Sequence, residues 1–447
     1  MAQLIRKYDA PVPRYTSYPT VPYWESAPDE KLWIQHLKTA LEPETSSFSL
    51  YLHIPFCESL CTFCGCNTVI TKDHKLESPY VNTLLHEMSL YLEKVPQLKT
   101  RKLKHLHLGG GTPTFLSSSE LKRLIQGILK NLTLDPQSFE GSIEVDPRRT
   151  TFEQMKALRE SGINRISLGV QDFDESVQKL VNRVQPFSIT QKITQEAREL
   201  GFTSVNYDLI YGLAKQTPES FQKTILQTIQ LSPDRIALYS FALVPWIKPA
   251  QRLFKDEDLP TPEVKRQLYE MARTELLKSG YVEIGMDHFA KSHDGLNLAR
   301  SKAHLHRNFM GYTDQKTDVL LGLGVSSISE SPYSFHQNEK IVTLYQQKVS
   351  QGIIPTHRGH VLTPDDVNHR KQILDMMTQL EVQLKPHQIE DAQDFLKEMI
   401  EDNLVKIIEG RLVLQENGRP FLRNVCLFFD QRYRKQKPTA KTFSQAI

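Results

Sequence analysis

The stretch SLYLHIPFCESLCTFCGC, residues 49–66, decides the interpretation of the chain. It begins with a short apolar segment that is typical of a buried strand. Four of the five cysteines follow within ten residues, Cys57, Cys61, Cys64 and Cys66, in the spacing C-x3-C-x2-C-x-C. The cysteines therefore lie on the loop that leaves the carboxyl end of this strand, where we expect a functional site.

Short apolar strands alternate with amphipathic helices from about residue 48 to 245. The candidate strands are residues 49–54, 104–108, 142–145, 165–170, 204–210 and 235–241. Between them, Ser78-Pro79 and Thr217-Pro218 predict helix starts, and Gly201 predicts a helix end. Six such repeats predict an α/β protein with a parallel sheet and outer helices, either doubly wound or a partial barrel.

The segments around this 48–245 core differ in character. Residues 1–47 are rich in Pro and Tyr and include RYTSYPT at 14–20. They form either a surface extension, which composition alone favours, or a lid. Residues 246–362 are expected to extend the core and carry substrate-site elements. Residues 363–447 are mainly helical with a hairpin around Glu409 and Gly410, like a winged-helix module; without a strongly basic helix, we expect a packing role.

The composition excludes several classes of protein. The 447 residues include 55 Lys and Arg and 52 Asp and Glu. The net charge is therefore close to zero and does not favour nucleic-acid binding. No apolar run approaches the roughly 20 residues that cross a bilayer. No uninterrupted apolar stretch precedes Pro11 and Pro13, which argues against a secretory signal. We therefore expect a cytoplasmic protein without nucleic-acid or membrane partners.

The cysteine usage indicates metal binding. Five cysteines are an odd number in a chain without an export signal, which argues against a disulfide framework. Structural zinc sites take ligands from two separated pairs, and no second Cys or His pair has suitable spacing; His74 is isolated. Compact cysteine loops are typical of iron–sulfur clusters. Three cysteines in C-x3-C-x2-C would hold three irons of a [4Fe–4S] cluster and leave the fourth open.

Glycine-rich and polar segments follow the later strands. HLGGGTPT, residues 107–114, has three glycines whose N–H groups are free to face a ligand, and Pro113 excludes a dinucleotide-binding GxGxxG loop. Glu144, Gln171 and Asp208 each stand at a strand end. Singly, each suits a structural hydrogen bond, whereas their repetition at successive strand ends favours a site.

C-x3-C-x2-C with Phe63 before the third cysteine resembles the radical S-adenosylmethionine motif. RYTSYPT, YLHIPFC, HLGGGTPT, IEVDPR, GVQDF, DLIYGL, GMDHFA, HRNF and GVSSIS occur in this order along nearly the whole chain. This ordered set resembles the oxygen-independent coproporphyrinogen III oxidases of the radical S-adenosylmethionine superfamily. The resemblance implies a partial (β/α)6 barrel with an N-terminal extension and a mainly helical C-terminal domain.

The resemblance also implies an oxidoreductase of haem and porphyrin biosynthesis. It would convert two propionate side chains of coproporphyrinogen III to vinyl groups, giving protoporphyrinogen IX, through a 5′-deoxyadenosyl radical from S-adenosylmethionine. A low-potential donor such as flavodoxin or ferredoxin would reduce the cluster, and an unidentified acceptor would take the final electrons. Family analogy implies a monomer and assigns no catalytic side chain beyond the cluster and its cofactor.

The ligand residues of the family carry over by position. Cys57, Cys61 and Cys64 would bind the metal cluster, and Cys66 would pack beside it without ligation. By similarity, two S-adenosylmethionine molecules bind. The cluster-bound molecule would contact Tyr51, Gly110, Glu144 and Ile328. The second would contact Phe63, Gly111, Thr112, Gln171, Arg183, Asp208 and Ala242.

Two other functions and one departure from the family's pattern stand beside this assignment. A related haem chaperone would bind haem without decarboxylation; such relatives carry Phe where this chain has Cys66 and lack the RYTSYPT extension. A zinc-dependent nucleic-acid-binding protein would use the cysteines structurally.

The family reads HRNFQGY where this chain has Met310, and a thioether cannot make the hydrogen bonds of a Gln amide.

Overall fold

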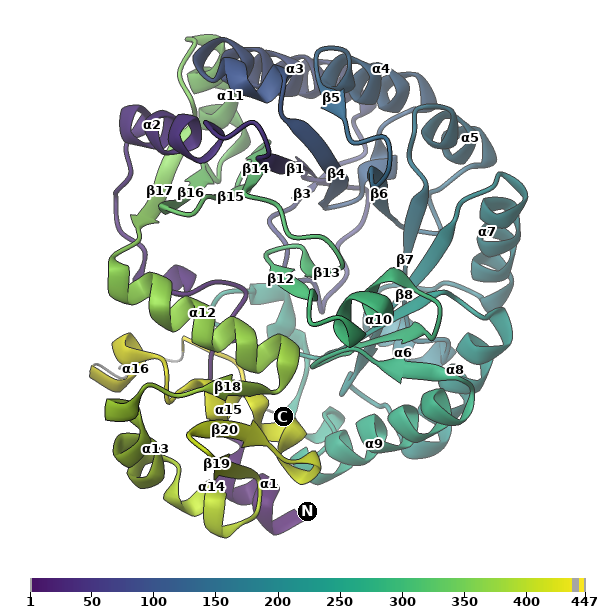
Figure 1. Ribbon diagram of the computed structural model, residues 1–447. Coiled ribbons are helices and arrows are strands. Elements are labelled where there is room, and N and C mark those ends of the chain that lie inside the picture. The colour runs from purple at the N-terminus through teal and green to yellow at the C-terminus, as the bar shows by residue number, and fades with distance from the viewer. Residues whose placement is uncertain (1, 436–441, 446–447) are drawn as a thin grey trace.

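The computed structural model describes residues 2–435 and 442–445 (Figure 1). Its main sheet contains six parallel strands that are neighbours in chain order. Each lies within two residues of a predicted strand, so the six predictions are confirmed. These strands are β1 (Ser47–Ile54), β4 (Lys102–Gly110), β6 (Glu140–Val145), β7 (Arg165–Gln171), β8 (Ser204–Tyr211) and β9 (Arg235–Ser240).

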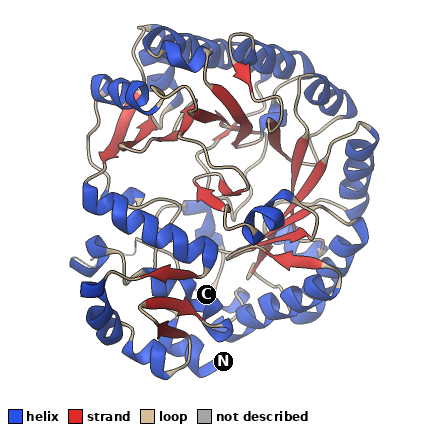
Figure 2. Cartoon of the chain, viewed as in Figure 1, coloured by secondary structure: helices blue, strands red, loops and turns tan. Residues whose placement is uncertain are grey.

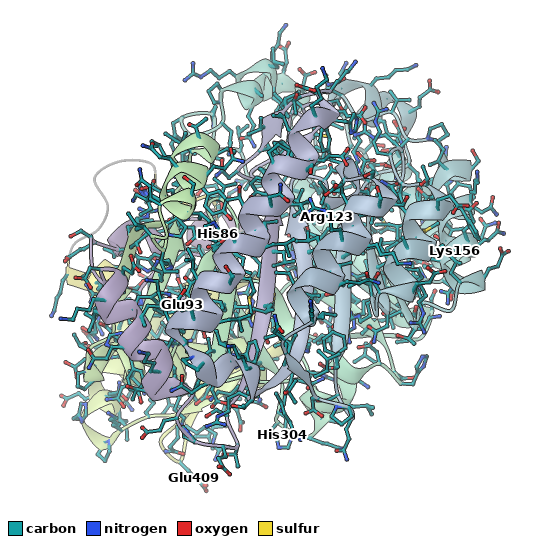
Figure 3. All side chains as sticks on the ribbon, turned by 90° about the horizontal axis from the view of Figure 1, so that it is seen from above. His86, Glu93, Arg123, Lys156, His304 and Glu409 are labelled. Carbon is teal, nitrogen blue, oxygen red and sulfur yellow. The ribbon has the colours of Figure 1, made fainter. Side chains whose placement is uncertain are left out.

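Helices form an outer ring around the curved sheet, and the strands line its inner side (Figures 1 and 2). This arrangement confirms the partial barrel and excludes the doubly wound alternative, which needs helices on both faces. Seen from above, the polar side chains of His86, Glu93, Arg123 and Lys156 lie on the outer faces of three helices (Figure 3). The ring contains α3 (Glu77–Lys94), α4 (Ser118–Leu129), α5 (Phe152–Glu160), α7 (Phe187–Glu199), α8 (Pro218–Leu231) and α9 (Pro262–Lys278).

Local signals explain most of these helix ends. Thr217 caps α8, because its hydroxyl accepts the N–H of Ser220. Gly201 follows α7 with a φ of +80°, a conformation in which glycine ends a helix without strain. The predicted cap at Ser78 is wrong: a 3-10 turn, His74–Leu76, leads directly into α3 at Glu77.

The sheet continues beyond both ends of the six strands. β14 (Val319–Leu323) pairs in parallel with β1, followed by the antiparallel strands β15 (Ile328–Glu330), β16 (Ser334–Asn338) and β17 (Thr356–Val361). At the other end, β11 (His288–Lys291) pairs with β9 and with β10 (Tyr281–Glu283). A separate hairpin, β12 (His306–Asn308) and β13 (Gly311–Thr313), lies inside the ring in Figure 1.

The C-terminal part packs around its own apolar core. Glu409 and Gly410 have φ values of +51° and +73°, which suits the tight turn of the predicted β19–β20 hairpin. Tyr15 and Tyr18 of the N-terminal segment are buried in the same core, so the two ends of the chain pack together. The helices here are α12 (Pro364–Gln379), α13 (Ile389–Phe395), α14 (Lys397–Glu401), α15 (Leu422–Cys426) and α16 (Gln431–Lys435), and the strands are β18 (Glu381–Gln383), β19 (Val405–Ile408) and β20 (Arg411–Leu414).

The N-terminal segment contributes two helices, α1 (Ala2–Tyr8) and α2 (Glu30–Ala40). Between them, Trp24 stacks on Phe335 of β16 with ring centroids 5.1 Å apart. This segment therefore contacts both the C-terminal core and the β14–β17 end of the sheet. Among the described helices, none combines the length and apolar character needed to cross a membrane.

Candidate active site

The cysteine loop leaves the carboxyl end of β1 and is closed at its base by a short strand pair. β2 (Phe56–Cys57) and β3 (Val69–Ile70) lie in parallel, and the N–H of Thr71 donates to the Cys57 carbonyl at 2.9 Å. All four thiols of the loop are free. Together with the ends of β4, β6, β7, β8 and β9, they line one cavity of about 390 Å³.

The glycine loop after β4 packs directly against the cysteine loop. The N–H of Gly111 donates to Ile54 at 2.7 Å, and the Thr112 hydroxyl lies 3.3 Å from the Cys57 sulfur. A Cβ at position 111 would stand 2.7 Å from the backbone oxygen of Pro55. Only glycine therefore permits this approach of the two loops.

Two guanidinium groups flank the Cys61 thiol. Nη1 of Arg183 lies 3.6 Å from the Cys61 sulfur, and Nη2 of Arg148 lies 3.7 Å from it. Both arginines also donate to the buried carboxylate of Asp146, at 3.1 and 2.7 Å. The Asp146 carboxylate therefore fixes both cations beside the cysteine.

The thiols differ in acidity because their surroundings differ. Burial raises the pKa of Cys57 to about 11, whereas hydrogen bonding from Cys66 lowers the pKa of Cys64 to about 6. Three free thiols on one loop, beside two cations, suit a cluster ligated by thiolates. The residues present therefore fit an iron–sulfur cluster held by Cys57, Cys61 and Cys64.

Two carboxyl groups at the strand ends have opposite pKa shifts. Burial opposes ionisation of Glu144, but hydrogen bonds from His107 Nε2 at 3.4 Å and the Gly110 N–H at 3.2 Å hold its pKa below its ordinary value. Burial, together with the charge of Glu144, raises the pKa of Asp208 to about 7. The Glu144 carboxylate is thus charged near neutral pH, while Asp208 retains its proton more readily.

The structure brings most of the predicted site residues together. All of them except Tyr51 and Ile328 line the cavity of the cysteine loop. Tyr51 lies in the adjoining wall, where its hydroxyl is 3.0 Å from Nδ1 of His53 and its ring stacks on His107. Ile328 is on β15 against Gly322, which pairs with Tyr51. The residues that line the cavity are Cys57, Cys61, Phe63, Cys64, Gly110, Gly111, Thr112, Glu144, Gln171, Arg183, Asp208 and Ala242.

Some contacts of the site were not predicted. Arg148 is the last residue of the IEVDPR motif, and membership of this motif is the only feature of the sequence that could have pointed to it. Lys248 donates to the carbonyl of Cys66 at 2.7 Å, and Gln251 donates to the carbonyl of Phe63 at 3.2 Å. These contacts join segments more than 180 residues apart in the chain, so no local sequence pattern predicts them.

A second, smaller space continues from the site into the barrel. It measures about 130 Å³ and shares Glu144, Asp208 and Tyr239 with the larger cavity. Met310, at the turn of the β12–β13 hairpin, lines it opposite these strand ends. The residue that departs from the family's pattern therefore faces the barrel interior.

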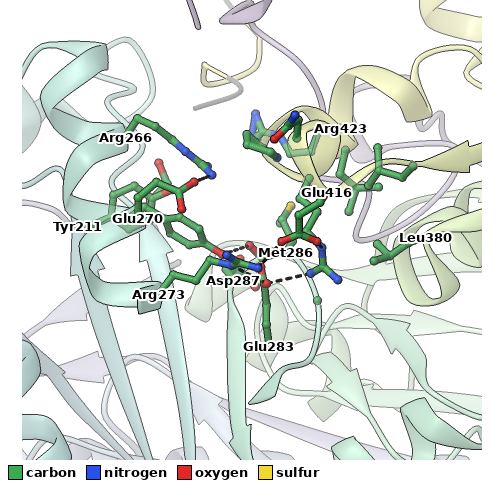
Figure 4. Close-up of a pocket in the computed structure, with 18 of the residues that line it drawn as sticks. Tyr211, Arg266, Glu270, Arg273, Glu283, Met286, Asp287, Leu380, Glu416 and Arg423 are labelled. Atoms are coloured by element: carbon green, nitrogen blue, oxygen red, sulfur yellow. Dashed lines mark hydrogen bonds and ion pairs between the residues drawn. The ribbon is translucent and has the colours of Figure 1, made fainter. Parts of the chain in front are cut away.

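A third cavity, of about 320 Å³, lies between α9 and the C-terminal part (Figure 4). Two arginines and two carboxylates of its wall form a network: Arg273 pairs with Glu283 at 2.8 Å and also with Glu416, and Arg419 bonds to both of the same carboxylates at 2.9 Å. These ion pairs link the barrel to the C-terminal part.

Comparison with known proteins now defines the class. Residues 51–227 match the Radical SAM superfamily, so the barrel and the cysteine loop are those of a radical S-adenosylmethionine protein. This class carries a [4Fe–4S] cluster and S-adenosylmethionine. The match does not favour the zinc-dependent nucleic-acid-binding alternative.

Whole-chain comparisons define the family. The chain is 40% identical to the oxygen-independent coproporphyrinogen III oxidase of Escherichia coli over 99% of this chain and 98% of that protein. Identity to the enzyme of the same name from Pseudomonas aeruginosa is 38%, over 96% and 95% of the two chains. A solved structure of coproporphyrinogen III oxidase from Escherichia coli, described as a radical SAM enzyme, superposes with a TM-score of 0.89 at 38% identity, over 97% and 99%. The chain belongs to the oxygen-independent coproporphyrinogen III oxidase family.

The family assignment confirms the resemblance seen in the motifs. The protein is a radical S-adenosylmethionine oxidoreductase, and none of these relatives favours the haem-chaperone alternative.

Proposed function

We propose that this protein converts coproporphyrinogen III to protoporphyrinogen IX by oxidative decarboxylation of two propionate side chains. Each propionate loses a β-hydrogen atom, carbon dioxide and one electron, and becomes a vinyl group. The observation that carries the proposal is the similarity over nearly the full chain to enzymes named for this substrate, combined with a complete cysteine site.

The chemistry requires a radical because the β-carbon C–H bond is unactivated. No side-chain base removes such a proton near neutral pH. When bound, the cluster and S-adenosylmethionine supply a 5′-deoxyadenosyl radical that takes a hydrogen atom instead. The protein's own contribution is to hold, orient and enclose the reactants.

Particular residues are proposed to hold the cofactors. Cys57, Cys61 and Cys64 would hold the cluster and leave one of its irons open to S-adenosylmethionine. The charged Glu144 carboxylate suits the cofactor's ammonium group. Tyr51, Gly110 and Ile328 are proposed to complete this first site.

A second S-adenosylmethionine molecule is proposed beside the first. Its contacts would be Phe63, Gly111, Thr112, Gln171, Arg183, Asp208 and Ala242. The support for this is that all seven line the same cavity as the cysteines. The guanidinium of Arg183, fixed by Asp146, would face the carboxylate of this molecule.

We also propose that the chain divides into an extension or lid at 1–47, a barrel core at 48–245, a core extension at 246–362 and a C-terminal domain at 363–447. It works as a cytoplasmic monomer without nucleic acid. It takes electrons from a low-potential donor such as flavodoxin or ferredoxin and passes the final electrons to an unidentified acceptor.

The test uses protein purified without air and reconstituted with iron and sulfide. Reductant, S-adenosylmethionine, coproporphyrinogen III and an electron acceptor are added, and 5′-deoxyadenosine and protoporphyrinogen are followed together. Formation of both products, dependent on the porphyrinogen, is the expected result. Cofactor cleavage without porphyrinogen conversion would contradict the substrate assignment and direct attention to Met310. Haem retention with neither product would support the chaperone function instead.

A further inference from the structure

The cavity between α9 and the C-terminal part contains more cations than carboxylates (Figure 4). Each carboxylate of its wall already has a cation. Two of the carboxylates belong to the ion-pair network described above, while Arg14 pairs with Asp287 and Arg266 pairs with Glu270. The charged residues that line the cavity are five arginines and four acidic residues: Arg14, Arg266, Arg273, Arg419, Arg423, Glu270, Glu283, Asp287 and Glu416.

The fifth arginine, Arg423, forms no ion pair within the described part of the chain. Its side chain is buried, and its Nη2 donates to the carbonyls of Val12 at 3.1 Å, Ser444 at 3.4 Å and Gln445 at 2.7 Å. Its Nε is buried and has no hydrogen-bond partner among the described residues. A buried, unsatisfied N–H on a charged group is costly, so an acceptor supplied by a ligand would stabilise it.

Arg266 lies on the opposite side of the cavity from Arg423 (Figure 4). Its Nε is also buried without a partner in the described structure. Burial lowers the pKa of Arg423 to about 10, and the charge of Arg14 adds to this effect. Burial lowers the pKa of the nearby Lys265 to about 8, and the charges of Arg423 and Arg14 contribute. These cations repel one another, and an anion bound among them would relieve the repulsion.

The cavity adjoins the cavity of the cysteine loop. Ser240, at the end of β9, lines both. Its neighbour Tyr239 lines the cysteine cavity and the smaller space inside the barrel. The guanidinium of Arg14, the first residue of the RYTSYPT segment, lies 5.7 Å from the centroid of the Tyr239 ring. A large ligand seated in the cysteine cavity therefore has these arginines beside it.

We propose that Arg423, Arg266 and Arg14 bind the propionate carboxylates of the substrate that the reaction leaves unchanged. The inference rests on the proposed function, because it takes coproporphyrinogen III as the substrate. This molecule carries two further propionates besides the two that react, and they need cations away from the cysteine site. Guanidinium groups bind carboxylates with paired, charge-assisted hydrogen bonds. The volume of about 320 Å³ suits propionate side chains but not the whole macrocycle.

The test measures porphyrinogen binding by the reconstituted protein without reductant, so that no turnover occurs. The probes are coproporphyrinogen III and protoporphyrinogen IX, which keeps only the unreacted propionates. Equilibrium dialysis without air gives the dissociation constants, and each probe is quantified afterwards as its oxidised, fluorescent porphyrin. We expect Arg423→Gln to raise both constants by about tenfold. Arg423→Lys, which keeps the charge, should recover most of the affinity.

Arg101→Gln is the matched control. The Arg101 guanidinium also donates to backbone carbonyls, those of Leu41 and Glu42 at 2.8 Å each, but Arg101 does not line the cavity. This variant should leave both dissociation constants at the wild-type value. Circular dichroism checks the folding of each variant. Arg266→Gln keeps the inference testable should Arg423→Gln not fold, and the same loss of affinity is expected.

Several outcomes would overturn the inference. Wild-type affinities in both Arg423→Gln and Arg266→Gln would show that the carboxylates bind elsewhere. A loss confined to coproporphyrinogen III would place a reacting propionate at the arginines. Weaker binding of S-adenosylmethionine in Arg423→Gln would assign the cavity to the cofactor.

Two further measurements separate the source of the anion and the proposed function. Stabilisation of the wild type by inorganic phosphate that is lost in Arg423→Gln, with unchanged porphyrinogen binding, would assign the cavity to a small free anion and overturn the inference. Porphyrinogen binding that depends on Arg423 without any conversion to protoporphyrinogen would contradict the proposed function, and the carboxylate site would stand.

Discussion

The Thr112 hydroxyl lies 3.3 Å from the Cys57 sulfur, so the cysteine loop and the glycine loop meet at the proposed metal ligand. The backbone reinforces this contact, since the N–H of Thr112 donates to Phe56 at 2.9 Å. One loop is proposed to hold the cluster and the other the cofactors. Their direct contact makes the position of each dependent on the other.

Substitution of Gly111 tests this dependence. In Gly111→Ala, the added Cβ meets the backbone of Pro55, which a side-chain rotation cannot relieve. We expect a loss of about 1–3 kcal/mol in the free energy of unfolding and a lower affinity for S-adenosylmethionine. Urea unfolding and equilibrium binding measure the two effects.

Gly65 provides the matched control, because a Cβ at this position of the cysteine loop has no atom within 4 Å. Gly65→Ala should leave the free energy of unfolding at the wild-type value. An equal loss of stability in the two variants would contradict the packing argument.

The cysteine assignment predicts a sharp division among four substitutions. Cys57→Ser, Cys61→Ser and Cys64→Ser should each abolish the cluster, because a three-cysteine site cannot lose a ligand. Cys66→Ser should leave it largely intact and is the matched control within the same loop. Iron and sulfide contents after reconstitution, with the visible absorbance, give the result. Full iron and sulfide in any of the first three variants would remove that residue from the ligand set.

Arg183 should contribute to stability as well as to cofactor binding. It is buried and shares the Asp146 carboxylate with Arg148. In Arg183→Met, that carboxylate loses one of its two cations, and we expect the free energy of unfolding to fall by about 3 kcal/mol. The exposed Arg149, which pairs with Glu58 at 3.0 Å, is the comparison. Arg149→Met should cost less than about 1 kcal/mol, and a reversed order would show that the buried pair is not a net stabiliser.

Glu87 should make stability depend on pH. Its carboxyl group accepts hydrogen bonds from Gly324, Asn338 and Tyr345, yet burial raises its pKa from 4.5 to about 7. The folded protein therefore binds this proton more tightly than the unfolded chain does. The resulting stabilisation is complete below about pH 4.5 and is lost as the pH rises through about 7.

The comparison with Glu87→Gln isolates this group. The difference in unfolding free energy between wild type and variant should shift by about 3 kcal/mol against the wild type from pH 4.5 to above pH 7. Glu93→Gln, on the exposed outer face of the same helix, should keep a constant difference (Figure 3). A constant difference for Glu87→Gln as well would contradict the raised pKa.

The sequence was most informative where one short segment determines its own structure. Each of the six core strands contains its own buried apolar residues, and the Glu409-Gly410 turn carries its own positive-φ signal. Ser78 is not the cap of α3, because the helix already begins at Glu77. The Glu77 carboxylate accepts the Ser117 N–H at 2.7 Å, a contact with a residue 40 positions away. Local propensity cannot include such a contact.

The residues of the candidate site were predictable where the order of the strands alone brings them together. The cysteines, the glycines and the strand-end residues converge because parallel strands end at one edge. The neighbours Lys248 and Gln251 were not predictable, because a long loop returns them to the cysteines. The position of Tyr51 and Ile328 in the adjoining wall depends on β14 pairing with β1 across about 270 residues, which no spacing in the sequence encodes.

Transfer of a hydrogen atom from the propionate β-carbon tests the central claim most directly. Coproporphyrinogen III carrying deuterium at these carbons is incubated with the reconstituted, reduced protein and S-adenosylmethionine, and the 5′-deoxyadenosine formed is analysed by mass spectrometry. We expect one molecule of 5′-deoxyadenosine, carrying one deuterium atom, for each vinyl group formed. Unlabelled 5′-deoxyadenosine formed alongside protoporphyrinogen would contradict it.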